Sequence, residues 1–228
     1  MNQKTLSSAF RASLPVMAGY VVLGIGFGVL LEKAGYGFLW AILMSFSIYG
    51  GSMQYASLDL ISGGAGFITT ALMTLMIQIR HFFYGISMLD RYQNTGKIKP
   101  YLIFALTDET YSLVCTGAPE GTNEKGYFFL VSLFDQIYWV GGSALGGLLG
   151  SVLPFDSTGM DFAMTALFVV IFVEQWQSVK SHIPAIIGLG ITLVCLILFG
   201  SSSFLIPSMV LITIALAICR KKLEVKMA

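Results

Sequence analysis

Long apolar segments occupy most of this 228-residue chain, and they restrict its fold more than any other feature. Most of them approach the roughly 20 residues that an α-helix needs to span about 30 Å of hydrocarbon. Their apolar residues are continuous instead of alternating with polar ones, which argues against a membrane β-barrel. The eight segments cover residues 12–31, 36–60, 63–89, 101–116, 126–153, 162–179, 183–199 and 204–219.

The composition points to the same class of protein, because 56% of the residues are hydrophobic and only 11% are charged. Soluble domains are about one quarter charged, so this chain has too little polar surface to stay dissolved. We therefore predict an all-α polytopic membrane protein with six to eight transmembrane segments, which forms a single transport domain over residues 1–228. Two sizeable polar loops, 90–100 and 118–125, interrupt the apolar pattern.

Several functional classes have no support in the sequence. The net charge is +1, and no basic surface interleaved with aromatic residues is present, so we predict no nucleic-acid partner. There is no phosphate-binding loop, no nucleophile triad and no metal-type spacing of cysteines. We therefore predict a protein that is not an enzyme and that needs neither a cofactor nor a metal.

The basic residues constrain the topology, because lysine and arginine near membrane segments favour the cytoplasmic side. They cluster at the N-terminus, in the 90–100 loop, at Lys180 and in the C-terminal tail. Eight simple crossings cannot place all four clusters in the cytoplasm. Six full crossings can do so if segments 12–31 and 126–153, both rich in glycine, are re-entrant or doubled helices. Whether these two segments cross fully or re-enter stays open.

A weak internal repeat accompanies that arrangement. The motif Gly24-x-x-x-Gly28 resembles Gly142-x-x-x-Gly146, and Gln54-Tyr55 is followed at a similar offset by Gln175-Trp176. The candidate units are residues 12–89 and 127–199, which would run in opposite directions through the membrane. Inverted repeats with broken helices are common in secondary transporters. Chance matches between glycines are the alternative.

Charged side chains also lie within the apolar segments. A charge at bilayer depth costs several kcal/mol, so such a residue usually faces a partner or a wet cavity and marks a pathway. We therefore predict that these residues form a charge network or carry coupling protons: Arg80, His81, Asp108, Glu109, Asp135 and Glu174.

Arg80 and the adjacent carboxylates allow more than one interpretation. Arg80 could be an interfacial anchor, could pair with a buried carboxylate, or could receive a substrate carboxylate. Neighbouring residues on a helix point about 100° apart, so Asp108 and Glu109 cannot both face the same partner. One of them would pair with Arg80, and the other would line a cavity and take a proton or an amine. His81 could change charge near neutral pH and relay protons.

The 50–55 motif, Gly-Gly-Ser-Met-Gln-Tyr, lies inside an apolar segment and predicts a helix break. Adjacent glycines weaken a helix by roughly 1 kcal/mol each relative to alanine. A packing surface of small residues is the alternative. If buried opposite charges pair first, the break is the better candidate for binding substrate through its backbone. The predicted substrate-binding or helix-break residues are Gly50, Gly51, Ser52, Gln54, Tyr55 and Tyr84.

Taken in order along the chain, these motifs resemble those of the AzlC family, the large subunit of bacterial branched-chain amino acid exporters. The matching motifs are Phe10-Arg11, Leu14-Pro15, Gly24–Gly28, Gly51-Ser52 with Gln54-Tyr55, Arg80-His81 with Tyr84-Gly85, Thr107-Asp108-Glu109, Tyr138-Trp139 with Gly142 and Gly146, and Gly159–Ala163. Each motif alone is weak, but their joint order and spacing are specific. The roles of Asp135 and Glu174 depend on the residues alone.

The resemblance implies export of small neutral amino acids such as valine, leucine, isoleucine or methionine, driven by an ion gradient. It also implies a multi-pass protein of the bacterial cytoplasmic (inner) membrane and a small multispanning partner of the AzlD type. Assembly into a homo-oligomer stays open. An uncoupled channel for small solutes and a non-transporting scaffold subunit are the alternatives, and dependence on a pH gradient would distinguish the channel from an exporter.

Overall fold

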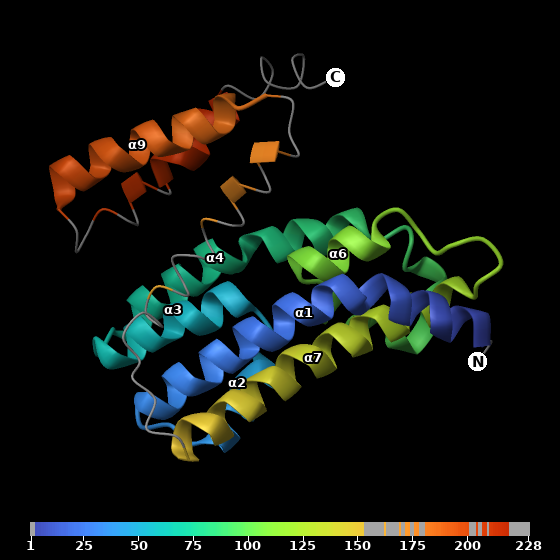
Figure 1. Ribbon diagram of the computed structural model, residues 1–228. Helices are drawn as coiled ribbons and strands as arrows, with labels where there is room; N and C mark the ends of the chain where they lie inside the picture. The colour runs from blue at the N-terminus through green and yellow to red at the C-terminus, as the bar shows by residue number, and fades with distance from the viewer. Residues whose placement is uncertain are drawn as a thin grey trace. The chain divides into compact units, whose positions relative to one another are not determined.

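The computed structural model describes residues 3–152, 162, 169, 172–173, 176–177, 181–200, 204, 207–208 and 210–218. Every regular element within these residues is helical, which confirms the all-α prediction. The chain forms two compact units, Met1–Met164 and Thr165–Ala228, and a single transport domain stays a prediction. In chain order the helices are α1 (Gln3–Lys33), α2 (Phe38–Ser47), α3 (Gly51–Ser62), α4 (Phe67–Ser87), the 3₁₀-helix η1 (Gln93–Ile98), α5 (Lys99–Phe104), α6 (Asp108–Val114), α7 (Glu124–Val152) and α9 (Ile183–Phe199) (Figure 1).

Helices α1 and α7 lie side by side at the centre of the first unit and run in the same direction (Figure 1). Near their start the Asn123 amide donates to Thr5 Oγ1 at 3.0 Å, and further along the rings of Tyr20 and Trp139 meet edge-on at 5.4 Å. The helices contain 31 and 29 residues, which corresponds to about 45 Å each. Both are long and apolar enough to cross a membrane.

This pair corrects the prediction that segments 12–31 and 126–153 are broken or doubled, because each of them forms one continuous helix. The predicted opposite direction of the two glycine motifs is also wrong, since the motifs lie on parallel helices and face each other. A helical glycine costs only about 1 kcal/mol relative to alanine, so packing between two helices can retain it without a break. The number of crossings and the cytoplasmic side stay predictions.

Close backbone contact explains the glycines of this interface. A Cβ atom at Gly24 would lie 3.0 Å from the backbone nitrogen of Ser143, and one at Gly142 would lie 2.9 Å from the Val21 carbonyl oxygen. A Cβ atom at Gly146 would meet the backbone of Ile25. Backbone atoms cannot move aside as a flexible side chain can. Small residues therefore set how closely these helices approach, as in other membrane helix pairs.

The predicted helix break in the second apolar segment is confirmed. Helix α2 ends at Ser47 and α3 begins at Gly51, with an extended backbone at Gly50. Tyr49 adopts a left-handed conformation, with φ of 43°. Such a conformation costs a bulky residue on the order of 1–3 kcal/mol, so the surrounding packing must hold it. A second break separates α5 from α6, where the side chain of Thr107 accepts a hydrogen bond from the Thr110 amide and caps α6.

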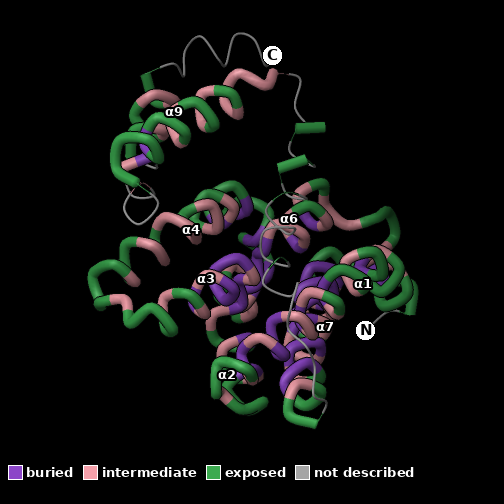
Figure 2. The backbone as a smooth tube through the Cα atoms, turned by 60° about the vertical axis from the view of Figure 1, so that its left-hand side comes forward, coloured by how far each residue is buried: buried purple, intermediate pink, exposed green. Residues whose placement is uncertain are grey.

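The buried apolar core of the first unit gathers where η1, α5 and α6 pack near the first half of α7. Burial is concentrated on α1, α3 and α7, whereas α4 is mostly exposed or half-buried (Figure 2). In the second unit α9 exposes most of its apolar side chains, and Cys195 is buried. The core of the first unit consists of Ala9, Met88, Tyr92, Leu102, Leu106, Val114, Tyr127, Phe128, Leu130 and Val131.

The glycine interface makes a testable prediction about stability. Gly146→Ala should lower the thermal unfolding midpoint of the detergent-solubilised protein, because overpacking against the Ile25 backbone costs on the order of 1–3 kcal/mol. Gly141→Ala is the matched control on the same helix, since a Cβ atom there has no neighbour within 4 Å. It should leave the midpoint unchanged or raise it. Equal effects of the two variants would contradict the close approach of α1 and α7.

Candidate functional site

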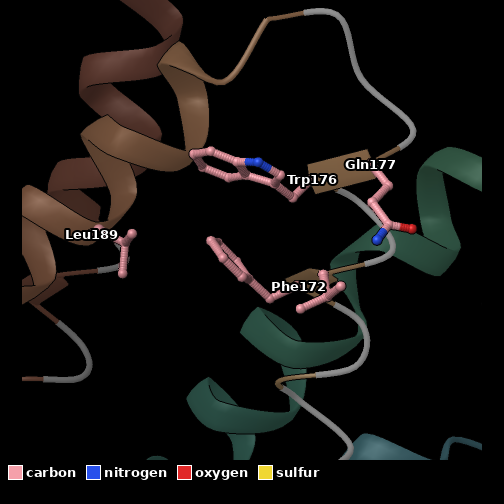
Figure 3. A pocket seen from close by; sticks show the side chains of 5 residues that line it. Phe172, Trp176, Gln177 and Leu189 are labelled. Carbon is pink, nitrogen blue, oxygen red and sulfur yellow. The ribbon is translucent and has the colours of Figure 1, made fainter.

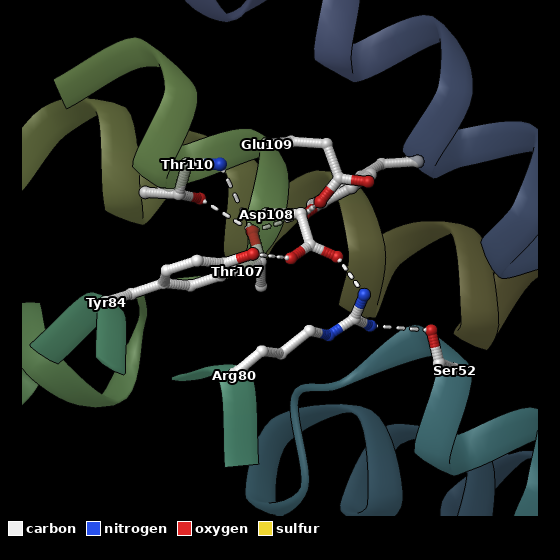
Figure 4. A network of polar contacts seen from close by, with 8 residues as sticks. Ser52, Arg80, Tyr84, Thr107, Asp108, Glu109 and Thr110 are labelled. Carbon is white, nitrogen blue, oxygen red and sulfur yellow. Dashed lines mark hydrogen bonds and ion pairs between the residues drawn. The ribbon is translucent and has the colours of Figure 1, made fainter. Parts of the chain in front are cut away.

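An ion pair between Arg80 and Asp108 joins three helices of the first unit (Figure 4). A guanidinium nitrogen of Arg80 on α4 lies 2.7 Å from Oδ2 of Asp108 on α6. The other terminal nitrogen donates to Ser52 Oγ on α3 at 2.9 Å, and the Tyr84 hydroxyl donates to Oδ1 of Asp108 at 2.7 Å. The predicted pairing of Arg80 with one of the two carboxylates is therefore confirmed.

Local structure explains why these groups meet. Arg80 and Tyr84 are four residues apart and share one face of α4. Asp108 occupies the first turn of α6, where a negative charge is favourable beside the free backbone N–H groups. By contrast, Phe82 and Phe83 lie on other faces of α4 and are 65% and 61% exposed, so they do not complete a pocket around the pair.

Glu109 belongs to a second cluster, which joins α1, α6 and α7. The Tyr20 hydroxyl donates to Glu109 Oε2 at 2.7 Å and lies 2.6 Å from Thr107 Oγ1. Thr107 and Thr110 are joined at 3.0 Å, and Thr110 Oγ1 donates to Asp135 Oδ2 at 2.8 Å. The structure thus separates the adjacent carboxylates of α6, as their angular spacing predicts.

The two clusters differ in their access to the surroundings. The side chains of Arg80 and Asp108 are 28% and 30% exposed. Asp135 is fully buried, and its Oδ1 atom has no hydrogen-bond partner among the described residues. The ion pair can therefore be reached from outside the first unit, whereas the Asp135 carboxyl is enclosed.

Gln54 and Tyr55 have structural contacts in this fold. Gln54 is fully buried; its amide nitrogen donates to Ser45 Oγ at 2.9 Å, and the Trp139 indole nitrogen donates to its amide oxygen at 2.7 Å. The Tyr55 hydroxyl donates to the Leu23 carbonyl oxygen at 2.6 Å. These bonds tie α3 to α2, α7 and α1. A part in substrate binding stays a prediction for these two residues, as it does for Gly50 and Gly51.

Two predicted network residues are not placed in either cluster. The His81 ring meets the Tyr84 ring edge-on at 5.9 Å, and the hydrogen bonds described for the two clusters do not include it. Glu174 lies outside the described residues. Sequence reasoning missed the joining roles of Tyr20 and Trp139. The sequence feature that could have predicted these roles is a polar group in the middle of an apolar helix. Such a group seldom stays without a hydrogen-bond partner when it is buried.

The second unit contains an apolar pocket of about 340 Å³ (Figure 3). The Trp176 ring stacks on the His182 ring at 4.0 Å. Among the described lining residues, Gln177 supplies the one polar side chain, so this pocket suits an apolar group better than a zwitterion. It is lined by Phe172, Val173, Trp176, Gln177 and Leu189.

The first unit thus combines two apolar helices of membrane-spanning length, α1 and α7, with an ion pair between α4 and α6 and a buried carboxyl on α7. This combination is typical of a helical membrane protein with an internal polar network. The chain belongs to the AzlC protein family, whose model matches residues 15–153. This confirms the resemblance inferred from the motifs.

Several known proteins are similar to this chain over most of its length. The branched-chain amino acid transport protein AzlC of Bacillus subtilis (strain 168) is 44% identical over 218 residues, which cover 95% of this chain and 86% of the relative. An uncharacterized membrane protein of Helicobacter pylori (strain 26695) is 41% identical over 97% of both chains. Inner membrane protein YgaZ of Escherichia coli K12 is 25% identical, over 78% of this chain and 76% of its own. No solved structure matches the chain.

A double-mutant cycle tests the ion pair. Arg80→Gln and Asp108→Asn should each lower the thermal unfolding midpoint in detergent, because each leaves one charge without its partner. The double variant should lose less than the sum of the two, with a coupling on the order of 1–3 kcal/mol. Arg91→Gln, in the connection after α4, is the matched control. Its effect on stability should be additive with that of Asp108→Asn. Additive losses for the Arg80 and Asp108 variants would show that the pair contributes nothing.

Proposed function

We propose that this protein is a secondary-active exporter of branched-chain and similar neutral amino acids in the bacterial inner membrane. The names of the Bacillus subtilis and Escherichia coli relatives support the substrate and the location. We further propose that efflux is coupled to proton entry and that a small multispanning AzlD-type protein is the partner. Both of these points extend the resemblance, and the proton coupling also rests on the carboxyls of the second cluster.

The observation that carries the proposal is the Arg80–Asp108 ion pair, which is only partly covered. A zwitterionic amino acid has the same two charges as this pair. Its carboxylate could replace Asp108 on the planar fork of Arg80, and its ammonium could then bind the released Asp108. Arg80 Nε is buried and has no hydrogen-bond partner among the described residues, so the guanidinium retains a donor for an incoming carboxylate.

Coupling needs a group that gains and loses a proton within the same bundle. The half-buried Glu109, next to Asp108 in the sequence, and the buried Asp135 provide two carboxyls, and neither of them bonds to Arg80 among the described residues. Proton entry from outside would load a carboxyl, and its release inside would accompany amino acid export. The Gly50–Gly51 break beside Ser52 gives a backbone that can adjust during this cycle.

Leucine efflux from proteoliposomes tests the role of Arg80. Arg80→Ala should reduce efflux at least roughly tenfold, because losing charge-assisted hydrogen bonds of about 1.5–3 kcal/mol lowers a rate by that factor or more. Arg91→Ala is the control, since it removes the same side chain from an exposed loop position and should keep the wild-type rate. Each chain should be reconstituted with and without an AzlD-type partner. Wild-type efflux by Arg80→Ala would overturn the substrate role of the ion pair.

A proton gradient tests the coupling. In proteoliposomes that contain the active protein and are loaded with leucine, an inward proton gradient should accelerate leucine efflux. External leucine should exchange with internal leucine by counterflow. An uncoupled channel would show neither effect. A scaffold subunit would leave Asp108→Asn and Glu109→Gln as active as the wild type, whereas an exporter of the proposed kind loses coupled efflux in at least one of them.

A further inference from the structure

A continuous series of hydrogen bonds links the two carboxyls of the second cluster, of which Glu109 is half-buried and Asp135 buried. It runs from Glu109 through Tyr20, Thr107 and Thr110 to Asp135; Figure 4 shows Glu109, Thr107 and Thr110. Its four oxygen–oxygen distances are 2.7, 2.6, 3.0 and 2.8 Å. All four lie within the ordinary range for hydroxyl and carboxyl hydrogen bonds. The Tyr20, Thr107 and Thr110 side chains between the carboxyls are buried, so the series is shielded from water.

Counting hydrogens shows that this series cannot be complete with both carboxyls ionised. Each hydroxyl supplies one hydrogen, and a carboxylate can only accept. The three hydroxyls of Tyr20, Thr107 and Thr110 therefore supply three hydrogens for four links. The backbone N–H of Thr110 donates to Thr107 Oγ1 as well, but that bond is a separate contact and fills none of the four links.

We infer that this hydroxyl series holds one additional proton, shared between the carboxyls of Glu109 and Asp135. With the proton on Glu109, every hydroxyl donates toward Asp135. With the proton on Asp135, every hydroxyl donates toward Glu109. Both arrangements satisfy all four links, and an unpaired oxygen in a buried site would cost about 1–3 kcal/mol. The series is thus a two-state proton carrier with one carboxylic acid at one end and one carboxylate at the other.

The two arrangements interconvert by moving one hydrogen along each link. The proton leaves the Glu109 carboxyl for the Tyr20 oxygen, and the Tyr20 hydrogen passes to Thr107 Oγ1. The Thr107 hydrogen passes to Thr110 Oγ1, and the Thr110 hydrogen passes to Asp135 Oδ2. No atom is gained or lost, and the negative charge moves from Asp135 to Glu109. The proton is thereby carried from α6 to α7 without any water in the path.

The surroundings favour a single proton over none. Arg80 pairs with Asp108 and forms no ion pair with Glu109 or Asp135 among the described residues. Oδ1 of Asp135 is buried without a hydrogen-bond partner among the described residues, which a neutral acid tolerates better than a carboxylate does. The ionisable groups that act on Glu109 are Tyr20, Tyr49, Arg80 and Asp108, and those that act on Asp135 are Tyr49, Tyr101, Glu109 and Tyr127.

Proton occupancy of the series follows from its geometry alone, whereas its use in export rests on the proposed function. Under that function, the series stores the coupling proton between its entry and its release. Thr110 is then a proton-relay residue, because its hydroxyl joins Thr107 to the Asp135 carboxyl.

Infrared spectroscopy tests the occupancy without any transport. The wild-type protein in lipid vesicles at neutral pH should show the C=O stretching band of one protonated carboxyl, which shifts in D₂O. Glu109→Gln and Asp135→Asn should each abolish this band, because the amide N–H group supplies the fourth hydrogen. Asp90→Asn, at an exposed carboxyl, should keep it. Absence of the band in the wild type, or its persistence in Glu109→Gln, would overturn the shared proton.

Proton uptake during leucine efflux tests the relay. Thr110→Val removes the joining hydroxyl at similar volume and should lower proton uptake per leucine at least roughly tenfold, as expected for loss of a positioned proton-transfer group. Thr110→Ser restores the hydroxyl and should restore the wild-type ratio. Wild-type coupling in Thr110→Val would overturn the relay. If the wild type exports no leucine, the proposed function fails, and the infrared result decides the proton occupancy independently.

Discussion

The close contact between the backbones of α1 and α7 is the constraint on which the first unit depends. Glycines on both helices let the chains approach to a distance at which a Cβ atom at Gly24 or Gly142 would touch the opposite backbone. This approach fixes the register that puts Tyr20 beside Trp139. Because Tyr20 and Asp135 are contributed by these two helices, a wider separation would break the hydrogen-bond series between the carboxyls. The packing of small residues thus determines the geometry of the polar site.

The short helix α6 provides the second requirement. Asp108 and Glu109 are its first two residues, so both acidic side chains fall in its first turn, where the backbone N–H groups have no partner within the helix. A helix end inside the protein needs partners for its backbone groups, and the buried Thr107 caps this one. Adjacent positions on α6 then direct Asp108 toward α4 and Glu109 toward α1. The first turn of α6 therefore contributes one residue to the ion pair and one to the hydrogen-bond series.

The sequence was informative where a local rule decides the structure. Paired glycines predicted the break at Gly50, and charge complementarity predicted the Arg80–Asp108 pair. The glycines of α1 and α7 led to the wrong prediction of broken helices. Glycine weakens a helix but also permits close packing, and the neighbouring helix determines which effect prevails. The series from Glu109 to Asp135 could not be predicted, since it joins hydroxyls 87 residues apart and apolar helices contain many unrelated threonines and tyrosines.

The two clusters differ in exposure, and this difference fits two separate functions: binding of a solute and storage of a proton. The ion pair is about one third exposed, which lets a solute reach it, while Asp135 is fully enclosed, which keeps a proton from exchanging freely. Asp108 and Glu109 are joined by a single peptide bond, so a rotation of α6 cannot move one without the other. Replacement of Asp108 on Arg80 by a substrate would therefore change the position of Glu109 against Tyr20. Such a shared rigid element is a physical means by which binding of an amino acid and movement of a proton can become linked.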